Sequence, residues 1–144
     1  MANIEHMQYI KIPAAKVYEA ITTEKGLGAT WTTQLIVQPE VGFINQFDFN
    51  DNYATKMKVV ELVENEKVVW ECIAADSEPA WVGTSVSFEL TEKDGRTAVL
   101  FRHLNWKEVS ECFRFCNYNW AMFLFSLKNY CETGTGTPYQ IRVF

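Results

Sequence analysis

The chain has 144 residues, 48% of them hydrophobic and 22% charged, with 13 Lys and Arg against 18 Asp and Glu and a formal net charge of −5. A chain of this length buries about two thirds of its unfolded surface, so residues 1–144 are expected to form one domain. No apolar run reaches the roughly 20 residues of a transmembrane helix, and no basic cluster is dense enough for nucleic acid or an anionic membrane surface. We therefore expect neither a nucleic acid partner nor integral membrane association.

The N-terminal part of the chain is predicted to form a strand followed by two short helices. Residues 1–7 lack the apolar segment of a secretory signal, from which we expect a cytoplasmic protein. Within residues 4–12 the isoleucines alternate onto one face, which predicts a strand. Residues 13–23 carry apolar side chains at spacings of three and four, typical of an amphipathic helix. Thr23 is a candidate N-cap for a further helical turn before Trp31.

The middle of the chain is predicted to form a meander of six strands. β-branched and aromatic residues alternate there with polar ones, between Gly, Asp and Asn residues that favour turns. The predicted strands cover residues 35–38, 43–49, 55–63, 67–74, 84–91 and 97–105. Short hairpin turns are expected at residues 64–67 and 92–95. A longer connection is expected at residues 74–81, where Pro79 interrupts strand pairing before Trp81.

The C-terminal part is predicted to form one long helix. Its apolar residues recur at alternating spacings of three and four: Phe113, Cys116, Trp120, Phe123, Leu127 and Tyr130. Ser110 is the candidate N-cap, and Gly134 gives a stop signal. Further apolar residues lie outside this stripe, namely Phe115, Tyr118, Met122 and Phe125. The helix therefore carries more apolar surface than one contact consumes.

This order of elements resembles the helix-grip fold of the START-like, birch-pollen-allergen-like (SRPBCC) superfamily. The resemblance extends to the family related to the activator of the ninety-kilodalton heat-shock protein's ATPase, through "IPAAKVYEAITTEKGLGATWT", "EVGFINQFDF", "KMKVVELVENEKVVWEC", "WVGTSVSFEL", "VLFRHLNW" and "FLFSLKNYCETGTGTP". It implies an α+β fold in which a curved antiparallel sheet of about seven strands wraps around the C-terminal helix, in many members with a cavity between them. It implies no single function, because the same scaffold serves ligand carriers, cyclases and co-chaperones.

His103 is the first candidate for chemistry. In the predicted strand 97–105 it shares a face with Val99 and Phe101, which we expect to point inward. A buried imidazole needs a hydrogen-bond partner or water. A general base would also need an orienting carboxylate or a nucleophile within reach, and the sequence identifies none. We therefore favour a polar residue at a pocket mouth, with catalysis or metal binding as the alternatives.

The cysteines are the second candidate. The chain has four, Cys72, Cys112, Cys116 and Cys131, and without a secretion signal they are expected to be reduced. Cys112 and Cys116 are four residues apart on the predicted helix, so they could hold a soft metal together with His103. Two of four ligands would still be unidentified, so packing as small hydrophobes is favoured. We expect no metal and no cofactor.

The aromatic residues are the third candidate. Sheet parity places Trp70 with Cys72, Val86 with Phe88, and Phe101 with His103 on the inward face. The predicted ligand pocket consists of Trp31, Trp70, Cys72, Trp81, Val86, Phe88, Phe101, His103, Trp120 and Phe123. The alternative is that these side chains simply pack as a core.

Three functions follow as hypotheses. The leading one is non-enzymatic binding of a small hydrophobic or amphipathic ligand between sheet and helix. The alternative is a protein-interaction module, a homodimer or a chaperone partner, that uses the excess apolar surface of the helix or Leu100 and Leu104 on the outer face of the sheet. A weaker alternative is a cyclase or hydrolase that uses His103.

Overall fold

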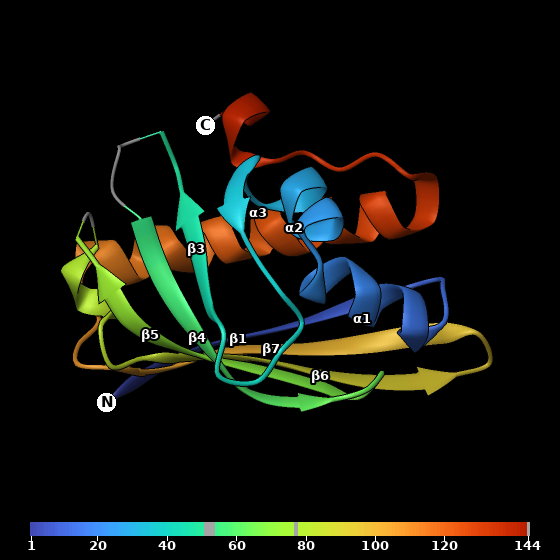
Figure 1. Ribbon diagram of the computed structural model, residues 1–144, viewed down its shortest axis with the longest axis horizontal. Helices are drawn as coiled ribbons and strands as arrows, with labels where there is room; N and C mark the ends of the chain where they lie inside the picture. The colour runs from blue at the N-terminus through green and yellow to red at the C-terminus, as the bar shows by residue number, and fades with distance from the viewer. Residues whose placement is uncertain (51–53, 77, 144) are drawn as a thin grey trace.

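A computed structural model describes residues 1–50, 54–76 and 78–143, and it shows a curved antiparallel sheet with a long helix across its inner face (Figure 1). The strands are β1 (Ala2–Ile10), β2 (Gln34–Ile36), β3 (Ile44–Asp48), β4 (Ala54–Val63), β5 (Lys67–Ala75), β6 (Ser85–Lys93) and β7 (Arg96–Trp106). Their order in the sheet is β1-β7-β6-β5-β4-β3-β2. The predicted α+β helix-grip fold is confirmed.

Two short helices follow β1, as predicted. They are α1 (Ala14–Thr22) and α2 (Glu24–Thr30). Pro13 is the N-cap of α1, one residue before the first turn. The Thr23 hydroxyl accepts a hydrogen bond from the Gly26 amide at 3.1 Å, which confirms Thr23 as the N-cap of α2. The helix α1 contacts β5, β6 and β7, so these helices cover one end of the inner face (Figure 1).

The turns between strands form where the breaker residues predicted them. Asn65 (φ 62°) and Asp94 (φ 55°) adopt the left-handed conformation that Asn and Asp tolerate in tight turns. In the predicted connection 74–81, residue 77 lies outside the described residues. The end of this connection forms the 3₁₀ helix η1 (Pro79–Trp81), which turns the Trp81 side chain into the interior.

The strand β7 contains an irregularity that alternation did not predict. Ile4 of β1 pairs with His103, whereas Ala2 pairs with Trp106, so β7 has one extra residue at this point. Asn105 lies there with φ 72° and is exposed. Strict alternation from His103 would turn Trp106 outward, but the bulge turns it back into the core, where it is 1% exposed. The strand therefore ends one residue later than predicted.

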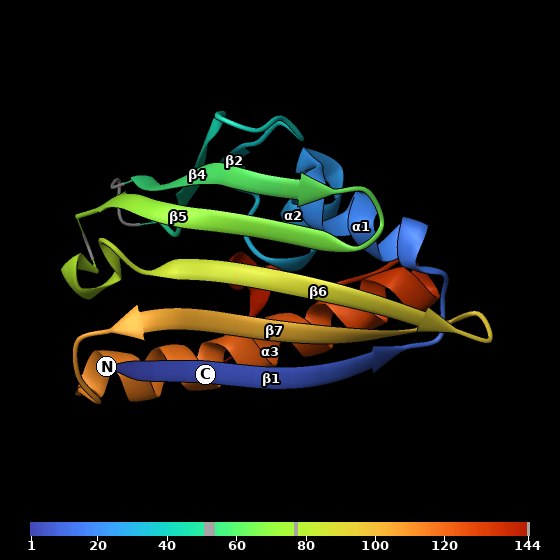
Figure 2. The same ribbon diagram turned by 90° about the horizontal axis from the view of Figure 1, so that it is seen from below.

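The helix α3 (Glu111–Thr133) runs along the sheet behind β7 and β1 (Figure 2). The Ser110 hydroxyl accepts a hydrogen bond from the Phe113 amide at 3.1 Å, and Gly134 ends the helix at φ 88°, as predicted. On the opposite face of α3 Phe115, Tyr118 and Phe125 are 51%, 61% and 60% exposed. Among the described helices, none is long and apolar enough to cross a membrane.

The close approach of α1 and α2 generates a first prediction. A Cβ atom on Gly26 would lie 2.1 Å from the carbonyl oxygen of Ala20, whereas one on Gly28 would lie 3.8 Å from Leu35 Cδ2. Gly26→Ala should therefore lower the free energy of unfolding by about 3 kcal/mol through overpacking against backbone. Gly28→Ala should leave it unchanged or raise it by about 0.5 to 1 kcal/mol, because Ala favours a helix. Urea unfolding measures both, and an equal loss in the two variants would contradict the packing.

Candidate functional site

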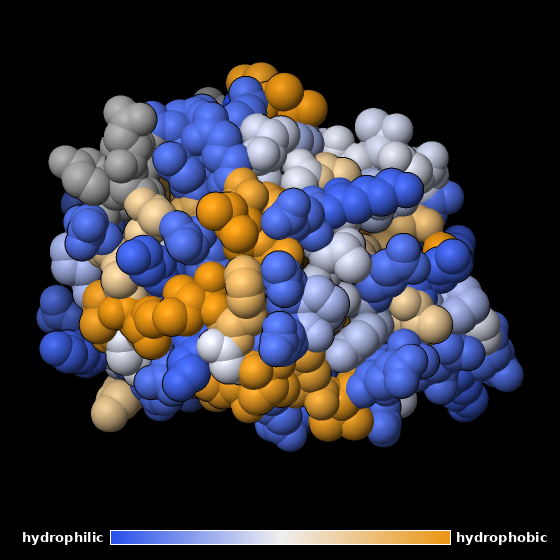
Figure 3. All heavy atoms as spheres, viewed as in Figure 1, coloured by the Kyte–Doolittle hydropathy of each residue, from blue (hydrophilic) through white to orange (hydrophobic). Residues whose placement is uncertain are grey.

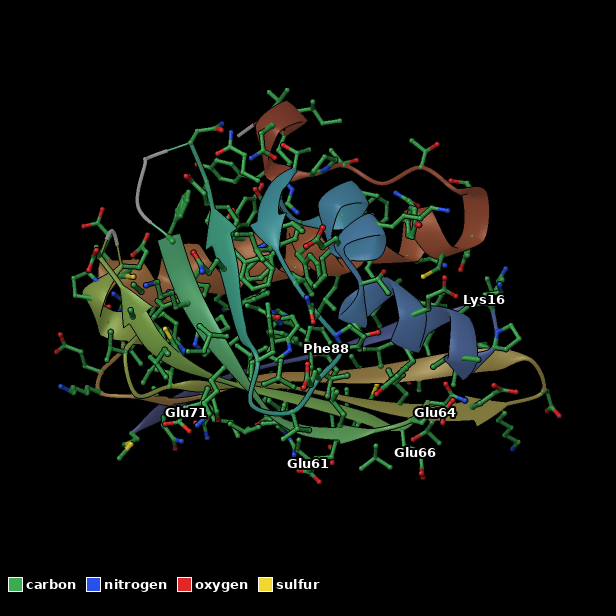
Figure 4. All side chains as sticks on the ribbon, in the orientation of Figure 1. Lys16, Glu61, Glu64, Glu66, Glu71 and Phe88 are labelled. Carbon is green, nitrogen blue, oxygen red and sulfur yellow. The ribbon has the colours of Figure 1, made fainter. Side chains whose placement is uncertain are left out.

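The space between the sheet and α3 is filled mainly by aromatic rings. All ten residues of the predicted pocket are buried there. The ring of Trp31 stacks on that of Trp70 with centroids 6.1 Å apart, and Trp81 stacks on Trp120 at 5.7 Å. Phe101 touches Trp120 at a centroid distance of 4.5 Å. Figure 4 shows Phe88 between the sheet and the helices, with Glu61 and Glu71 on the outer side of the sheet. The middle of the grip is therefore a packed core.

His103 lies in this core at 0% exposure and is hydrogen-bonded on both sides. The indole N–H of Trp120 donates to His103 Nδ1 at 3.0 Å. His103 Nε2 lies 2.7 Å from the Thr84 hydroxyl oxygen. Because that hydroxyl donates its own proton to the Trp81 carbonyl at 2.6 Å, it accepts from His103. This fixes the neutral imidazole with its proton on Nε2.

In this environment His103 cannot act as a general base or as a metal ligand. Burial lowers the pKa of His103 from 6.5 to about 3, so the imidazole is neutral at physiological pH. A proton on Nδ1 would face the Trp120 N–H, which cannot accept it. Neither ring nitrogen is available to a metal or a substrate. The expectation of an inward His103 with a hydrogen-bond partner is met, but the residue lies in the core and not at a pocket mouth.

A cavity of about 210 Å³ opens at the end of the grip where η1 meets α3. Its lining consists of Trp31, Phe49, Thr55, Glu78, Trp81, Phe115, Cys116, Asn119, Trp120, Tyr139 and Arg142. Of the predicted pocket residues, three line this cavity: Trp31, Trp81 and Trp120. The other seven pack in the core beyond it: Trp70, Cys72, Val86, Phe88, Phe101, His103 and Phe123. Ring contacts close the middle of the sheet, and this cavity lies at one end of it.

Sequence reasoning missed most of the remaining lining residues. Tyr139 and Arg142 belong to the segment after α3, which returns along the helix; the Tyr139 amide donates to the Trp31 carbonyl at 2.7 Å. This segment has no hydrophobic period that would place it. Phe115 was recognised only as surplus apolar surface of the helix. Long-range contacts bring these side chains to the cavity.

Two polar groups of the cavity have incomplete pairing. The Arg142 guanidinium donates from Nε to the Thr137 carbonyl and from Nη2 to the Thr30 carbonyl, both at 2.8 Å. Burial lowers the pKa of Arg142 to about 10, and no carboxylate among the described residues forms an ion pair with it. Asn119 donates to the Phe115 carbonyl at 3.1 Å, but its buried Oδ1 has no hydrogen-bond partner within the described part of the chain.

Cys112 and Cys116 come together with Glu78, and not with His103 as the sequence hypothesis had it. The Cys112 thiol donates to Glu78 Oε2 at 2.8 Å, and the two sulfurs are 3.8 Å apart. The Trp81 indole N–H donates to Cys116 Sγ at 3.3 Å. Burial raises the pKa of both thiols, for Cys112 with a further contribution from its hydrogen bond to Glu78. All four cysteines are free, and both of these thiols are protonated at neutral pH.

Comparisons with known proteins agree with this architecture. The sequence profile of the family described as "Activator of Hsp90 ATPase homolog 1-like protein" matches residues 11–132. The solution structure of the Aha1 dimer from Colwellia psychrerythraea is 38% identical, covers 94% of this chain and 100% of that one, and superposes with a TM-score of 0.85. No curated protein gives a significant match.

Two more distant structures share the fold alone. A protein from Staphylococcus saprophyticus is 15% identical over 94% of this chain and 95% of its own, with a TM-score of 0.77. DynU16, from the dynemicin biosynthetic locus, is 19% identical over 93% of this chain and 48% of its own, with a TM-score of 0.76. At this level of identity neither structure carries information about the site.

The buried neutral imidazole generates a second prediction. His103 takes up a proton near pH 6.5 in the unfolded chain but only near pH 3 in the folded one. The free energy of unfolding should therefore fall as the pH drops from 6.5 toward 3, by up to about 1.4 kcal/mol per unit from this residue. In His103→Gln that contribution is absent. Urea unfolding should show the wild-type advantage over the variant shrinking by about 2 kcal/mol between pH 6 and pH 4. Parallel pH profiles would contradict this account of His103.

Proposed function

The chain belongs to the family described as Activator of Hsp90 ATPase homolog 1-like protein, and from that premise we propose that it binds a small apolar or amphipathic molecule in the cavity between η1, α3 and the C-terminal segment. Family membership alone selects no function, because the scaffold serves many. The observation that carries the proposal is the wall of three tryptophans, Trp31, Trp81 and Trp120, around an open space. Indole rings offer large, rigid apolar surfaces to a ligand.

The size of the cavity limits the ligand. Its volume of about 210 Å³ lies below the roughly 300 to 1,000 Å³ of pockets that hold drug-sized molecules. A single aromatic ring or a short branched chain fits inside. A longer molecule would leave its remaining part at the mouth, where the half-exposed ring of Phe115 offers further apolar surface.

Two opposite charges line the cavity, the Glu78 carboxylate and the Arg142 guanidinium, and Arg142 is the group that would pair with an anionic head group. The two described hydrogen bonds of Arg142 go to backbone carbonyls, which carry no charge. No described carboxylate forms an ion pair with its guanidinium. A carboxylate on the ligand would supply the missing counter-charge and accept hydrogen bonds from the guanidinium. Asn119 Oδ1, which lacks a partner among the described residues, would accept a bond from a ligand hydroxyl or a water.

Binding without catalysis is favoured over the cyclase or hydrolase hypothesis. His103 lies outside the cavity lining, and both of its nitrogens are engaged. The one thiol in the lining, Cys116, has a raised pKa and is a poor nucleophile at neutral pH. The charged groups at the cavity are therefore suited to recognition.

A titration with phenylacetate tests the proposal. We expect phenylacetate to shift the indole N–H resonances of Trp81 and Trp120 in spectra of ¹⁵N-labelled protein, with about tenfold higher affinity than the neutral phenylacetamide because of Arg142. Thr55→Phe should abolish binding, because Thr55 is buried and lines the cavity. Its matched control is Lys56→Phe, the next residue of β4, which points to solvent and should leave binding intact. Saturable shifts that survive Thr55→Phe, or none with either compound, would contradict the site.

A second candidate function, self-association, is favoured by the outer face of α3. This α3 face consists of Phe115, Tyr118, Met122 and Phe125. In the C-terminal segment Ile141 and Val143 are also exposed. On the side of the molecule seen in Figure 3, by contrast, hydrophobic atoms are divided by hydrophilic ones. The similar protein from Colwellia psychrerythraea is described as a dimer. We propose that this chain also dimerises, through the α3 face; a chaperone partner would use the same surface.

Matched charge substitutions separate the two apolar surfaces. We expect a dimer in sedimentation equilibrium whose dissociation constant rises at least about tenfold in Phe125→Glu, because a carboxylate would be buried at the interface. Leu100→Glu, on the outer face of the sheet, should leave it unchanged. If instead Leu100→Glu raised the dissociation constant and Phe125→Glu did not, the interface would lie on the sheet. A wild-type monomer at all concentrations would contradict self-association.

A further inference from the structure

We propose that Glu78, Cys112 and Cys116 bind one thiophilic divalent cation, Zn²⁺ in the first place, with a fourth coordination position open to the cavity. This inference is independent of the proposed ligand binding. Their ligand atoms, one carboxylate oxygen and two sulfurs, all lie within 4.8 Å of one another. Three protein ligands plus an open position is the arrangement of zinc sites that bind an exchangeable molecule.

The distances suit a tetrahedral ion. With zinc–sulfur bonds of about 2.3 Å, two sulfurs of a tetrahedral site lie about 3.8 Å apart. The sulfurs of Cys112 and Cys116 are 3.8 Å apart before any ion enters. The Cys112 sulfur and Glu78 Oε2 are at hydrogen-bond distance, 2.8 Å, and would separate by about 0.7 Å once the proton between them leaves.

The three ligands are held by two separate elements. Cys112 and Cys116 lie one turn apart at the start of α3, which the Ser110 cap fixes. Glu78 precedes η1, where its amide donates to the Ala75 carbonyl at 3.1 Å and its carbonyl accepts from the Trp81 amide at 2.9 Å. An ion would therefore tie η1 to α3 across the cavity rim.

The surroundings supply the outer contacts that metal sites use. The Trp81 N–H that now donates to Cys116 Sγ at 3.3 Å would stabilise a thiolate in the same position. Glu78 and Cys116 line the cavity, so one side of the ion would face open space. Asn119, one turn after Cys116, lines the same cavity with its buried Oδ1 lacking a partner in the described residues. It would accept a hydrogen bond from a water on the ion.

Replacing the two thiol protons by one divalent cation leaves the charge of the site unchanged. Two S–H bonds break, two sulfur–metal bonds form, and two protons leave to solvent, with no change of oxidation state. The site carries one negative charge from Glu78 beforehand, and one negative charge afterwards, as a dication with two thiolates and a carboxylate. Sulfur ligands select Zn²⁺ or Co²⁺ over Mg²⁺ and Ca²⁺.

A cobalt titration of the full chain under a non-thiol reductant tests the site. We expect Co²⁺ to give a thiolate-to-cobalt charge-transfer band and the visible bands of four-coordinate cobalt, saturating at one ion per chain and displaced by Zn²⁺. Cys112→Ser and Cys116→Ser should lose the charge-transfer band. Glu78→Gln should weaken the affinity about 10- to 100-fold. Cys131→Ser, which alters a thiol outside the cluster, is the matched control and should behave as wild type.

Two results would overturn the site. One is a wild-type protein that gives no charge-transfer band, and the other is a band that persists in Cys116→Ser. A thermal melt of each variant without metal establishes that it is folded. Zn²⁺ should raise the melting temperature of wild type and of Cys131→Ser, but not that of Cys112→Ser or Cys116→Ser. Phenylacetate binding by metal-free protein is measured separately, so failure of the metal site and failure of the proposed ligand site are distinguishable.

Discussion

The hydrogen bonds of His103 join three parts of the fold inside a buried aromatic core. Its Nδ1 accepts from Trp120 of α3, its Nε2 donates to Thr84 just before β6, and Thr84 donates to the Trp81 carbonyl of η1. A buried polar group that lost one of these partners would cost about 1 to 3 kcal/mol. This series of hydrogen bonds therefore fixes α3, η1 and the sheet relative to one another. It also orients the two stacked tryptophans that form the inner wall of the cavity.

The aromatic packing determines where the grip is open. Rings of Trp31, Trp70, Phe88, Phe101 and Trp120 contact one another across the middle of the sheet. The cavity walled by tryptophans lies at the end of this packed region, beside η1 and the C-terminal segment. The cavity is small because the aromatic side chains at the centre of the sheet are large enough to contact those of α3 and fill the space between them.

The seam between η1 and α3 concentrates the groups that could respond to a ligand. It holds the carboxylate of Glu78, the thiols of Cys112 and Cys116, and the amide of Asn119, and Arg142 lies across the same cavity. Apolar binding and metal binding would therefore occupy adjoining parts of one space, with Trp81 in contact with both.

Periodicity in the sequence determined the element order, the inward face of the strands and the caps of α2 and α3. These depend on side chains within a few residues of each other, as with Ser110 and Phe113. The sequence also placed His103 and Phe101 inward. Tertiary structure alone decided that Trp106 turns inward, because a bulge at Asn105 reverses alternation. It decided that Glu78 and not His103 meets the cysteines, and that Arg142 reaches the cavity, because these contacts join segments far apart in the chain and no local pattern encodes them.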